Sequence, residues 1–214
     1  METCVQYLIR EVSDFFRPVL SDRKIMQYNK DGLLLETLIT EAQLQPNSVD
    51  LTLADSWKIL EPNIESAPHF GDVPMIDSKS PIKYKEGSFT KGVNGQSYYI
   101  IQPKQFVLMA SNEILNIPNG IIAFVQGRSS VARLAIQTEQ AGLIDAGFRG
   151  TITFEVFNQS DFPIILYKGT RVAQVYFFKA QHALVPYGLD KGSKYNGQIV
   201  ATGSRIHMDQ ENFE

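Results

Sequence analysis

The segment TITFEVF, residues 151–157, alternates polar and apolar side chains along its length. Such alternation over about four to eight residues is typical of a β-strand with one buried face. Working outward, short apolar or alternating runs recur at residues 48–53, 98–101, 106–110, 121–125, 164–167 and 172–178. Turn signals separate them, including Pro118-Asn119-Gly120, Pro163 and Lys168-Gly169. This series of short strands predicts a mainly β chain folded as an antiparallel sandwich or barrel.

Helical patterning is confined to the first part of the chain. Apolar residues recur at helical spacing from Met1 to about Leu20, with Pro18 near the end of the run. A second helix is predicted to begin at Ser21 and to end at the turn Asp31-Gly32. We therefore expect a helical extension at residues 1–19, followed by one domain at residues 20–214.

Two segments lack clear periodicity. Residues 69–96 are rich in Pro, Ser, Lys and Gly, which predicts a long surface excursion between strands. Residues 187–203 are polar and glycine-rich, yet they carry Tyr187, Lys194 and Gln198. These three side chains are able to contact an anionic ligand, so we expect the C-terminal segment to close over one.

Composition excludes several kinds of partner. The 214 residues are 43% hydrophobic and carry a formal net charge of -3, which gives no sign of nucleic-acid or anionic-membrane binding. The single cysteine, Cys4, has no internal partner for a disulfide, and no run is apolar enough for a membrane span or a signal peptide. A reducing, cytoplasmic setting is expected.

Polar and charged residues occupy the stretch from Gly127 to Arg133, directly after an apolar strand. Its two serines suit a capped strand-to-helix junction, but hydroxyls and arginines at such a junction also suit an anion site. Downstream, the carboxylates of Asp145 and Glu155 interrupt apolar sequence. If Glu155 faces Ser129 and Arg133, it is poised for proton transfer; a buried Arg–Glu pair that stabilises the sheet is the alternative.

Several other chemistries lack their motifs. His69, His182 and His207 are isolated, and no Cys-x-x-Cys or His-x-Glu pattern is present, so no zinc centre is expected. The chain also has no Gly-x-Ser-x-Gly elbow and no phosphate-binding loop that ends in Gly-Lys-Ser or Gly-Lys-Thr. The absence of these motifs argues against an acyl-transfer enzyme and against an ATP-hydrolysing protein.

The span from Leu20 to Arg205 resembles the dCTP deaminases, which share the fold of the trimeric dUTPases. The resemblance rests on separated motifs that occur in the same order in this chain: Leu20-Ser21-Asp22-Arg23, residues 45–51, 127–133, 141–150 with Glu155, 169–174, 186–188, 193–198, and Ser204-Arg205. It implies a distorted, jelly-roll-like β-barrel with a few short helices. It also implies a homotrimer with active sites between subunits, over which a segment at about residues 187–205 closes.

The resemblance assigns chemical roles by position. Glu155 is implied to be the general base and acid that activates water for attack on C4 of cytosine, without a metal. Ser129 and Arg133 are implied to hold this water, and a backbone carbonyl near Ala141 to orient it. The remaining substrate contacts are implied at Arg128, Ser130, Asp145, Phe148, Thr153, Tyr187, Lys194 and Gln198. Magnesium is implied to accompany the triphosphate.

Within this resemblance the favoured reaction is deamination of dCTP to dUTP and ammonia. Glu155 favours it, because plain dUTPases normally carry an aliphatic residue at the matching position. Relatives that convert dCTP to dUMP tend to have Ala-Gly, an aromatic residue and Ile-Asp at the turn where this chain has Ala141-Gly142-Leu143-Ile144-Asp145. Gly142 favours that bifunctional type, whereas Leu143 does not. The alternatives are therefore a dUMP-forming enzyme, a dUTPase, and a non-catalytic regulator that binds nucleotides. Besides dCTP, dUTP and dTTP are possible ligands.

Overall fold

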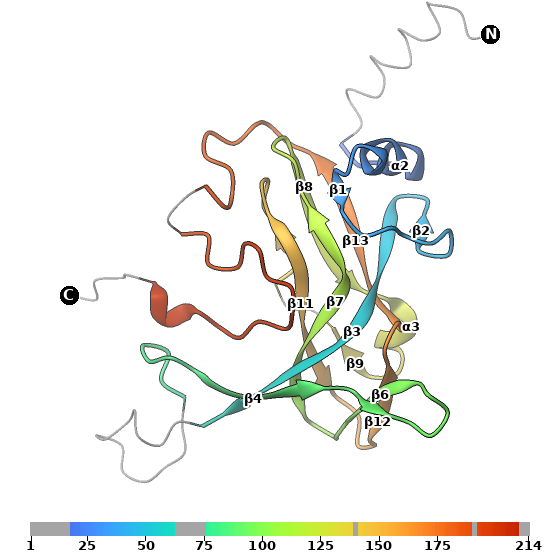
Figure 1. Cartoon of the computed structure of the whole chain (residues 1–214), viewed down its shortest axis with the longest axis vertical. Coiled ribbons are helices and arrows are strands. Elements are labelled where there is room, and N and C mark those ends of the chain that lie inside the picture. The colour runs from blue at the N-terminus through green and yellow to red at the C-terminus, as the bar shows by residue number, and fades with distance from the viewer. Residues whose placement is uncertain (1–17, 63–75, 139–140, 190–191, 210–214) are drawn as a thin grey trace, which may run out of the picture.

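The computed structural model describes residues 18–62, 76–138, 141–189 and 192–209, and a strongly curled β-sheet forms its centre (Figure 1). The prediction of a mainly β fold with a few short helices is confirmed. The described elements are α2 (Asp22–Lys30), β1 (Leu34–Leu35), β2 (Leu44–Gln45), β3 (Ser48–Glu61), β4 (Lys83–Ser88), β5 (Thr90–Lys91), β6 (Ser97–Ile101), β7 (Phe106–Asn116), β8 (Ile121–Gly127), α3 (Ser129–Ala132), β9 (Ile136–Gln137), β10 (Leu143–Ile144), β11 (Arg149–Asn158), β12 (Ile164–Tyr167), β13 (Arg171–Lys179) and the 3-10 helix η2 (Ile206–Met208).

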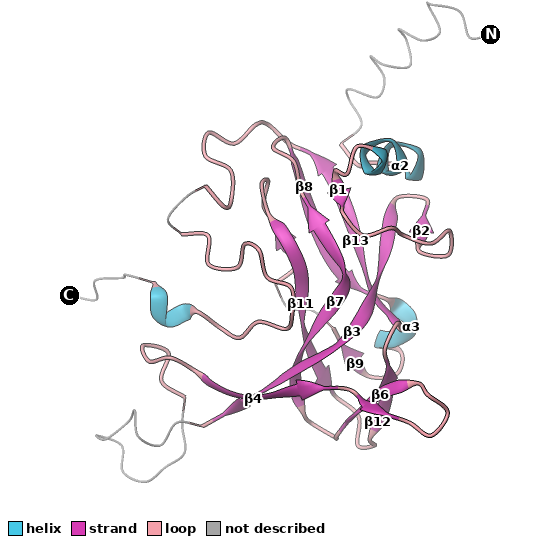
Figure 2. Ribbon diagram, in the orientation of Figure 1, coloured by secondary structure: helices cyan, strands magenta, loops and turns pink. Residues whose placement is uncertain are grey.

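The main sheet has the strand order β10-β8-β13-β3-β7-β11-β9, and neighbouring strands are antiparallel. Strand β3 joins its two halves: Leu51 is opposite Ala173 of β13, whereas Lys58 is opposite Leu108 of β7. The register with β7 shifts between Leu53 and Trp57, and such irregularities bend a strand and increase its twist. A smaller sheet, β12-β6-β5, lies at one end (Figure 2).

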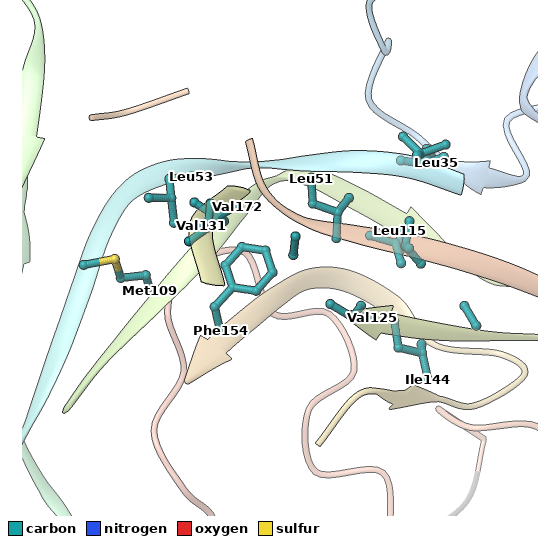
Figure 3. Packing of buried hydrophobic residues seen from close by; sticks show 14 of the residues in the cluster. Leu35, Leu51, Leu53, Met109, Leu115, Val125, Val131, Ile144, Phe154 and Val172 are labelled. Atoms are coloured by element: carbon teal, nitrogen blue, oxygen red, sulfur yellow. The ribbon is translucent and has the colours of Figure 1, made fainter. Parts of the chain in front are cut away.

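The core fills the inside of the curl. Phe154 of β11 is fully buried among Leu53 of β3, Val131 of α3 and Val172 of β13 (Figure 3). Successive side chains on a strand point to opposite faces, so Glu155, the next residue, points away from this cluster. The alternation that predicted β11 therefore also fixes the side of the strand on which its carboxylate lies.

The N-terminal predictions have different outcomes. Residues 1–17 of the predicted first helix lie outside the described residues, but Val19 at its end forms a β-bridge with Phe178. Helix is therefore the wrong prediction for that position. The second predicted helix is confirmed as α2, whose buried Ile25 anchors it on the sheet. The division of the chain at residue 19 stays a prediction.

The prediction of a long surface excursion at residues 69–96 overlooked two strands in its described part. Strand β4 pairs with β3 from Ser88↔Ser56 to Lys83↔Glu61, and β5 pairs with β6. The polar composition concealed β4, because its side chains are mostly exposed and the pairing uses backbone groups. Gly87 allows the close approach of Trp57: a Cβ at Gly87 would lie 2.7 Å from Cζ2 of the indole.

An exposed ion pair fastens the start of β11. Arg149 donates from Nε to Oε1 of Glu36 at 2.5 Å and from Nη2 to Oε2 at 3.0 Å. The hydrogen bond from Arg149 and its charge hold the pKa of Glu36 below its usual value of 4.5. The ion pair therefore adds stability above pH 4.5, and this contribution is lost as the pH falls through the folded-state pKa.

We expect Glu36→Gln to lower the melting temperature by only about 1–2 °C at neutral pH, since exposed pairs contribute little. Differential scanning fluorimetry from pH 7 to pH 3 measures this difference, which should vanish at the acid end. Glu41→Gln, at an exposed turn, is the matched control. A difference that persists at pH 3 would show that Glu36 acts through packing instead.

Candidate active site

A cavity of about 750 Å³ lies beside β11. It brings together predicted site residues from the stretch just before β10, from the β10–β11 turn, from β11 itself and from the C-terminal segment. These residues are Ala141, Asp145, Phe148, Thr153, Glu155, Tyr187, Lys194 and Gln198. Sequence reasoning therefore identified much of one cavity before the fold was known.

Glu155 occupies the middle of one cavity wall. Its side chain lies on the same face of β11 as Thr153 and is half-buried, and Leu108 of β7 is directly opposite. Phe106 and Leu60 extend the apolar wall. A carboxylate held on a rigid strand in a largely apolar cavity is able to accept a proton from water and return it to a leaving group.

Asp145 and Phe148 reach the cavity from the turn between β10 and β11. The turn is held by hydrogen bonds from Gly147 N to Ile117 O at 2.9 Å and from Phe148 N to Asp145 O at 3.2 Å. The Asp145 side chain is exposed at the cavity, whereas Phe148 is buried with its ring centroid 5.9 Å from that of Tyr187. This turn therefore supplies a hydrogen-bond acceptor beside an aromatic surface.

The C-terminal segment runs beside β11 (Figure 2), lines the same cavity, and forms backbone hydrogen bonds with this turn and with β11. Tyr187 N donates to Ala146 O at 2.8 Å, and Thr151 N donates to Gln198 O at 2.9 Å. Gln198 Nε2 also donates to Thr151 O at 2.6 Å, whereas its buried Oε1 has no hydrogen-bond partner among the described residues. A ligand with a donor group would satisfy that oxygen.

Lys194 brings a positive charge to the same cavity. Its Nζ lies 2.6 Å and 2.8 Å from the two carboxylate oxygens of Asp209, which follows η2. Arg205 donates to the Lys194 carbonyl and lies over the Tyr195 ring, 5.8 Å from its centroid. These contacts hold the segment in a folded position beside the cavity, so we expect its closure to depend on them.

Gly147 allows the closing segment to approach. Its φ is +97°, and a Cβ there would lie 2.5 Å from Tyr187 O and 2.7 Å from Pro186 Cβ. We expect Gly147→Ala to displace the segment, with a stability loss of about 1–3 kcal/mol from backbone strain and crowding.

Trypsin cleavage after Lys194 and Arg205 measures that displacement and should become faster in Gly147→Ala. The matched control is Gly169→Ala, because Gly169 has φ +81° with nothing within 4 Å of its added Cβ. It imposes the backbone strain without the steric contact. Equal tryptic rates in both variants would contradict the assigned role of Gly147.

The polar stretch from Gly127 to Arg133 lies outside this cavity. Arg128, Ser129 and Ser130 line a second cavity of about 540 Å³, together with Gln126 and Gln174. Arg128, with extended backbone, is the N-cap of α3, while both serines are exposed residues of its first turn. The interpretation that the serines cap the helix is therefore wrong.

Glu155 does not meet Ser129 or Arg133 within one chain. Val131, between those two residues, packs into the core with Phe154, while Glu155 points to the other face of β11. Arg133 is exposed at the end of α3 and lines neither cavity. Among the described residues of one chain, neither the predicted contact nor its alternative, a buried Arg–Glu pair, is formed, and a contact between chains stays a prediction.

Sequence reasoning missed a charged residue at the second cavity. Asp50 of β3 is 1% exposed, with its carboxylate oxygens 3.3 Å from Arg128 Nε and 3.0 Å from Arg171 Nη1. Burial raises the pKa of Asp50, and the two arginines oppose that rise. The signal was present, since Asp50 interrupts the apolar run from Val49 to Leu51 as Glu155 interrupts its own strand.

No group of three or more His, Cys, Asp or Glu side chains is arranged to hold a metal ion in the described part of the chain. Among the described helices, none has the length and apolar character needed to span a membrane.

Comparisons with known proteins identify the family and agree with the fold. The family model described as dCTP deaminase-like matches residues 19–180. The "dCTP deaminase, dUMP-forming" of Sulfurihydrogenibium sp. (strain YO3AOP1) is 38% identical over 194 residues, which cover 90% of this chain and 99% of that protein. The protein of the same name from Aquifex aeolicus (strain VF5) is 37% identical over 196 residues, 90% of this chain and 97% of that protein.

A solved structure supports the architecture. The crystal structure of 2'-deoxycytidine 5'-triphosphate deaminase from Agrobacterium tumefaciens aligns with a TM-score of 0.56 at 20% identity. The alignment covers 76% of this chain and 48% of that chain, so it spans about half of the solved protein. At this identity the similarity shows the fold, and it confirms the predicted fold class.

Proposed function

Because this chain belongs to the dCTP deaminase-like family, we propose that it is an enzyme that converts dCTP to dUMP, ammonia and pyrophosphate. The sequence favoured dUTP as the product, with the dUMP-forming reaction as an alternative. The named relatives favour that alternative, since both are dUMP-forming. Gly142 therefore agrees with the reaction of these relatives, although Leu143 stands where an aromatic residue was expected.

One observation carries the proposal: Glu155 and Asp145 line a single cavity. Two hydrolytic steps need two different polar groups, one near the cytosine ring and one near the sugar and phosphates. Glu155 on the apolar strand wall suits the base, and Asp145 on the exposed turn suits the other end. The cavity that they share has a volume of about 750 Å³, which is within the range of small-molecule binding sites.

In the first step, Glu155 takes a proton from water as the oxygen attacks C4 of cytosine. It then returns that proton to the exocyclic nitrogen, which leaves as ammonia, while the proton of the new C4 hydroxyl moves to N3 and the C4 carbonyl of uracil forms. In the second step, another water attacks phosphorus and pyrophosphate leaves, giving dUMP. Asp145 accepts a hydrogen bond from the 3'-hydroxyl and positions the sugar for both steps.

The remaining contacts follow from the cavity wall. Phe148 packs against the deoxyribose, Thr153 and the carbonyl of Ala141 border the base and its water, and the closing segment covers the ligand. Lys194 exchanges Asp209 for a phosphate oxygen, while Tyr187 and Gln198 hold the segment in place. Lys194 and the buried Gln198 Oε1 support this assignment, because each has a charge or acceptor that a nucleotide complements.

A second copy of the chain completes the site in this proposal. Ser129 and Arg133 are exposed and turned away from Glu155 of their own chain, which makes them accessible to another subunit. In a homotrimer, they hold the attacking water beside the partner's carboxylate, and Arg128 and Ser130 contact phosphates. Magnesium enters with the triphosphate and neutralises its charge, since hard oxygen ligands on phosphate suit that ion.

Turnover of dCTP in ¹⁸O-labelled water tests the proposed reaction. The expected product is dUMP with one ¹⁸O at C4, and a second ¹⁸O appears on the phosphate products, as measured by mass spectrometry. Accumulation of dUTP labelled at C4 would instead identify a dUTP-forming deaminase. Phosphate label without ammonia would identify a dUTPase, and binding without any label would identify a regulator.

A further inference from the structure

The second cavity contains a buried carboxylate to which the proposed reaction assigns no role. Asp50 lies on β3 opposite Gln174 of β13, the strand that carries Arg171, and β13 separates β3 from β8, whose end leads to Arg128 (Figure 1). Each of its two carboxylate oxygens faces a different arginine. The side chains of Arg128 and Arg171 are 26% and 37% exposed, so both arginines extend from a buried anchor toward solvent.

The arginine contacts fix one edge of the Arg128 guanidinium. Its Nε lies 3.3 Å from Asp50 Oδ1, and its Nη1 donates to the Arg171 carbonyl at 3.3 Å. Arg171 is held in turn, because its Nη1 donates to Ala42 O at 2.6 Å and to Asp50 Oδ2 at 3.0 Å. No hydrogen bond from Nη2 of Arg128 is present within the described part of the chain, and Arg128 lines the same cavity as Ser129 and Ser130.

We propose that Asp50 is a positioning residue for the triphosphate, which it serves by holding Arg128 in the orientation that contacts phosphate oxygens. This inference rests on the proposed function, because it takes the second cavity as part of the nucleotide site. Asp50 itself touches no substrate. A guanidinium presents its donors in one plane, so fixing Nε and Nη1 also fixes where Nη2 points.

Removing the carboxylate has a defined effect. A free arginine samples many rotamers and must give up that freedom when it binds a phosphate, whereas one anchored in advance loses less. In Asp50→Asn only one oxygen remains, and the new amide group donates toward an arginine that itself only donates. We therefore expect binding of the triphosphate to weaken although the net positive charge of the cavity increases.

The test compares the native enzyme with Asp50→Asn in two assays. Calorimetric titration with inorganic tripolyphosphate should show a Kd about tenfold higher in the variant, and the KM for dCTP should rise by a similar factor. The kcat for ammonia release should change by less than about threefold, because Asp50 is proposed to act on phosphate binding through Arg128 and not on the reacting atoms. Asp55→Asn is the matched control, since Asp55 is on the same strand but pairs with exposed Lys168.

A double-variant cycle separates positioning from general loss of structure. Arg128→Ala should weaken tripolyphosphate binding, and adding Asp50→Asn to it should weaken binding no further. Full additivity, or a Kd that Asp50→Asn leaves unchanged, would overturn the inference while dCTP turnover by the native enzyme upheld the proposed function. A native protein that neither binds tripolyphosphate nor turns over dCTP would overturn both.

Discussion

Replacing Glu155 with glutamine is expected to lower kcat for ammonia release from dCTP by about 10³-fold, the size of effect typical of a lost general base and acid. Glutamine keeps the size and hydrogen-bonding capacity of the side chain but does not accept a proton from water. The strand should be unaffected, because Phe154 and Val156 anchor β11 in the core on either side of residue 155. Affinity for dCTP, measured by calorimetry, should therefore stay within about threefold of the native value.

Assaying the Glu155→Gln variant with dUTP separates an effect on deamination from a general loss of activity. Deamination is not required for dUTP, so Glu155→Gln should still convert dUTP to dUMP at a rate close to that of the native enzyme. Glu41→Gln, which removes an exposed carboxylate outside the site, should alter neither reaction. Normal ammonia release by Glu155→Gln would show that another group activates the water.

Mixing two inactive variants is expected to restore activity. Glu155→Gln and Arg133→Ala should each reduce ammonia release by about 10²-fold or more, because each removes one half of the catalytic arrangement. In the proposed trimer, a site takes Glu155 from one subunit and Arg133 from the next. Random assortment of equal amounts of the two chains then leaves about a quarter of the sites with both native residues.

The mixed sample must be unfolded and refolded together, or co-expressed, so that subunits exchange. A mixture of Glu155→Gln with Glu155→Gln,Arg133→Ala is the control and should remain inactive, because no site regains a carboxylate. Recovery of about a quarter of native kcat in the first mixture supports a shared site. No recovery in well-mixed trimers would place Arg133 and Glu155 in one subunit's site and contradict the geometry of β11 and α3.

The alternation of apolar and polar residues predicted those strands that have one buried face and one exposed face. The run at residues 151–157 corresponds to β11, at Arg149–Asn158, because alternating burial is recorded directly in its sequence. The run at residues 48–53 is only the first half of β3, which continues to Glu61. Its second half is half-buried and pairs with the polar strand β4, so neither strand leaves a clear hydrophobic pattern.

Site residues that stand out from their local sequence could be predicted. Contacts that depend on how distant elements pack together could not. Asp145 and Glu155 were identified because each interrupts apolar sequence, and burying a carboxylate without a partner is energetically unfavourable. The separation of Glu155 from Arg133 follows from the burial of Val131 beside Phe154, which no local pattern encodes. Asp50 met the same criterion as Glu155, but its two arginine partners come from β13 and the end of β8.

The most direct test of the proposed reaction is the ratio of ammonia to pyrophosphate released while the native enzyme consumes dCTP with magnesium. Coupled assays follow both products in one sample, and chromatography identifies the nucleotide. One site that carries out both hydrolyses predicts equal amounts of the two products throughout, with dUMP as the only new nucleotide. Ammonia with accumulating dUTP and no pyrophosphate, or pyrophosphate without ammonia, would contradict it.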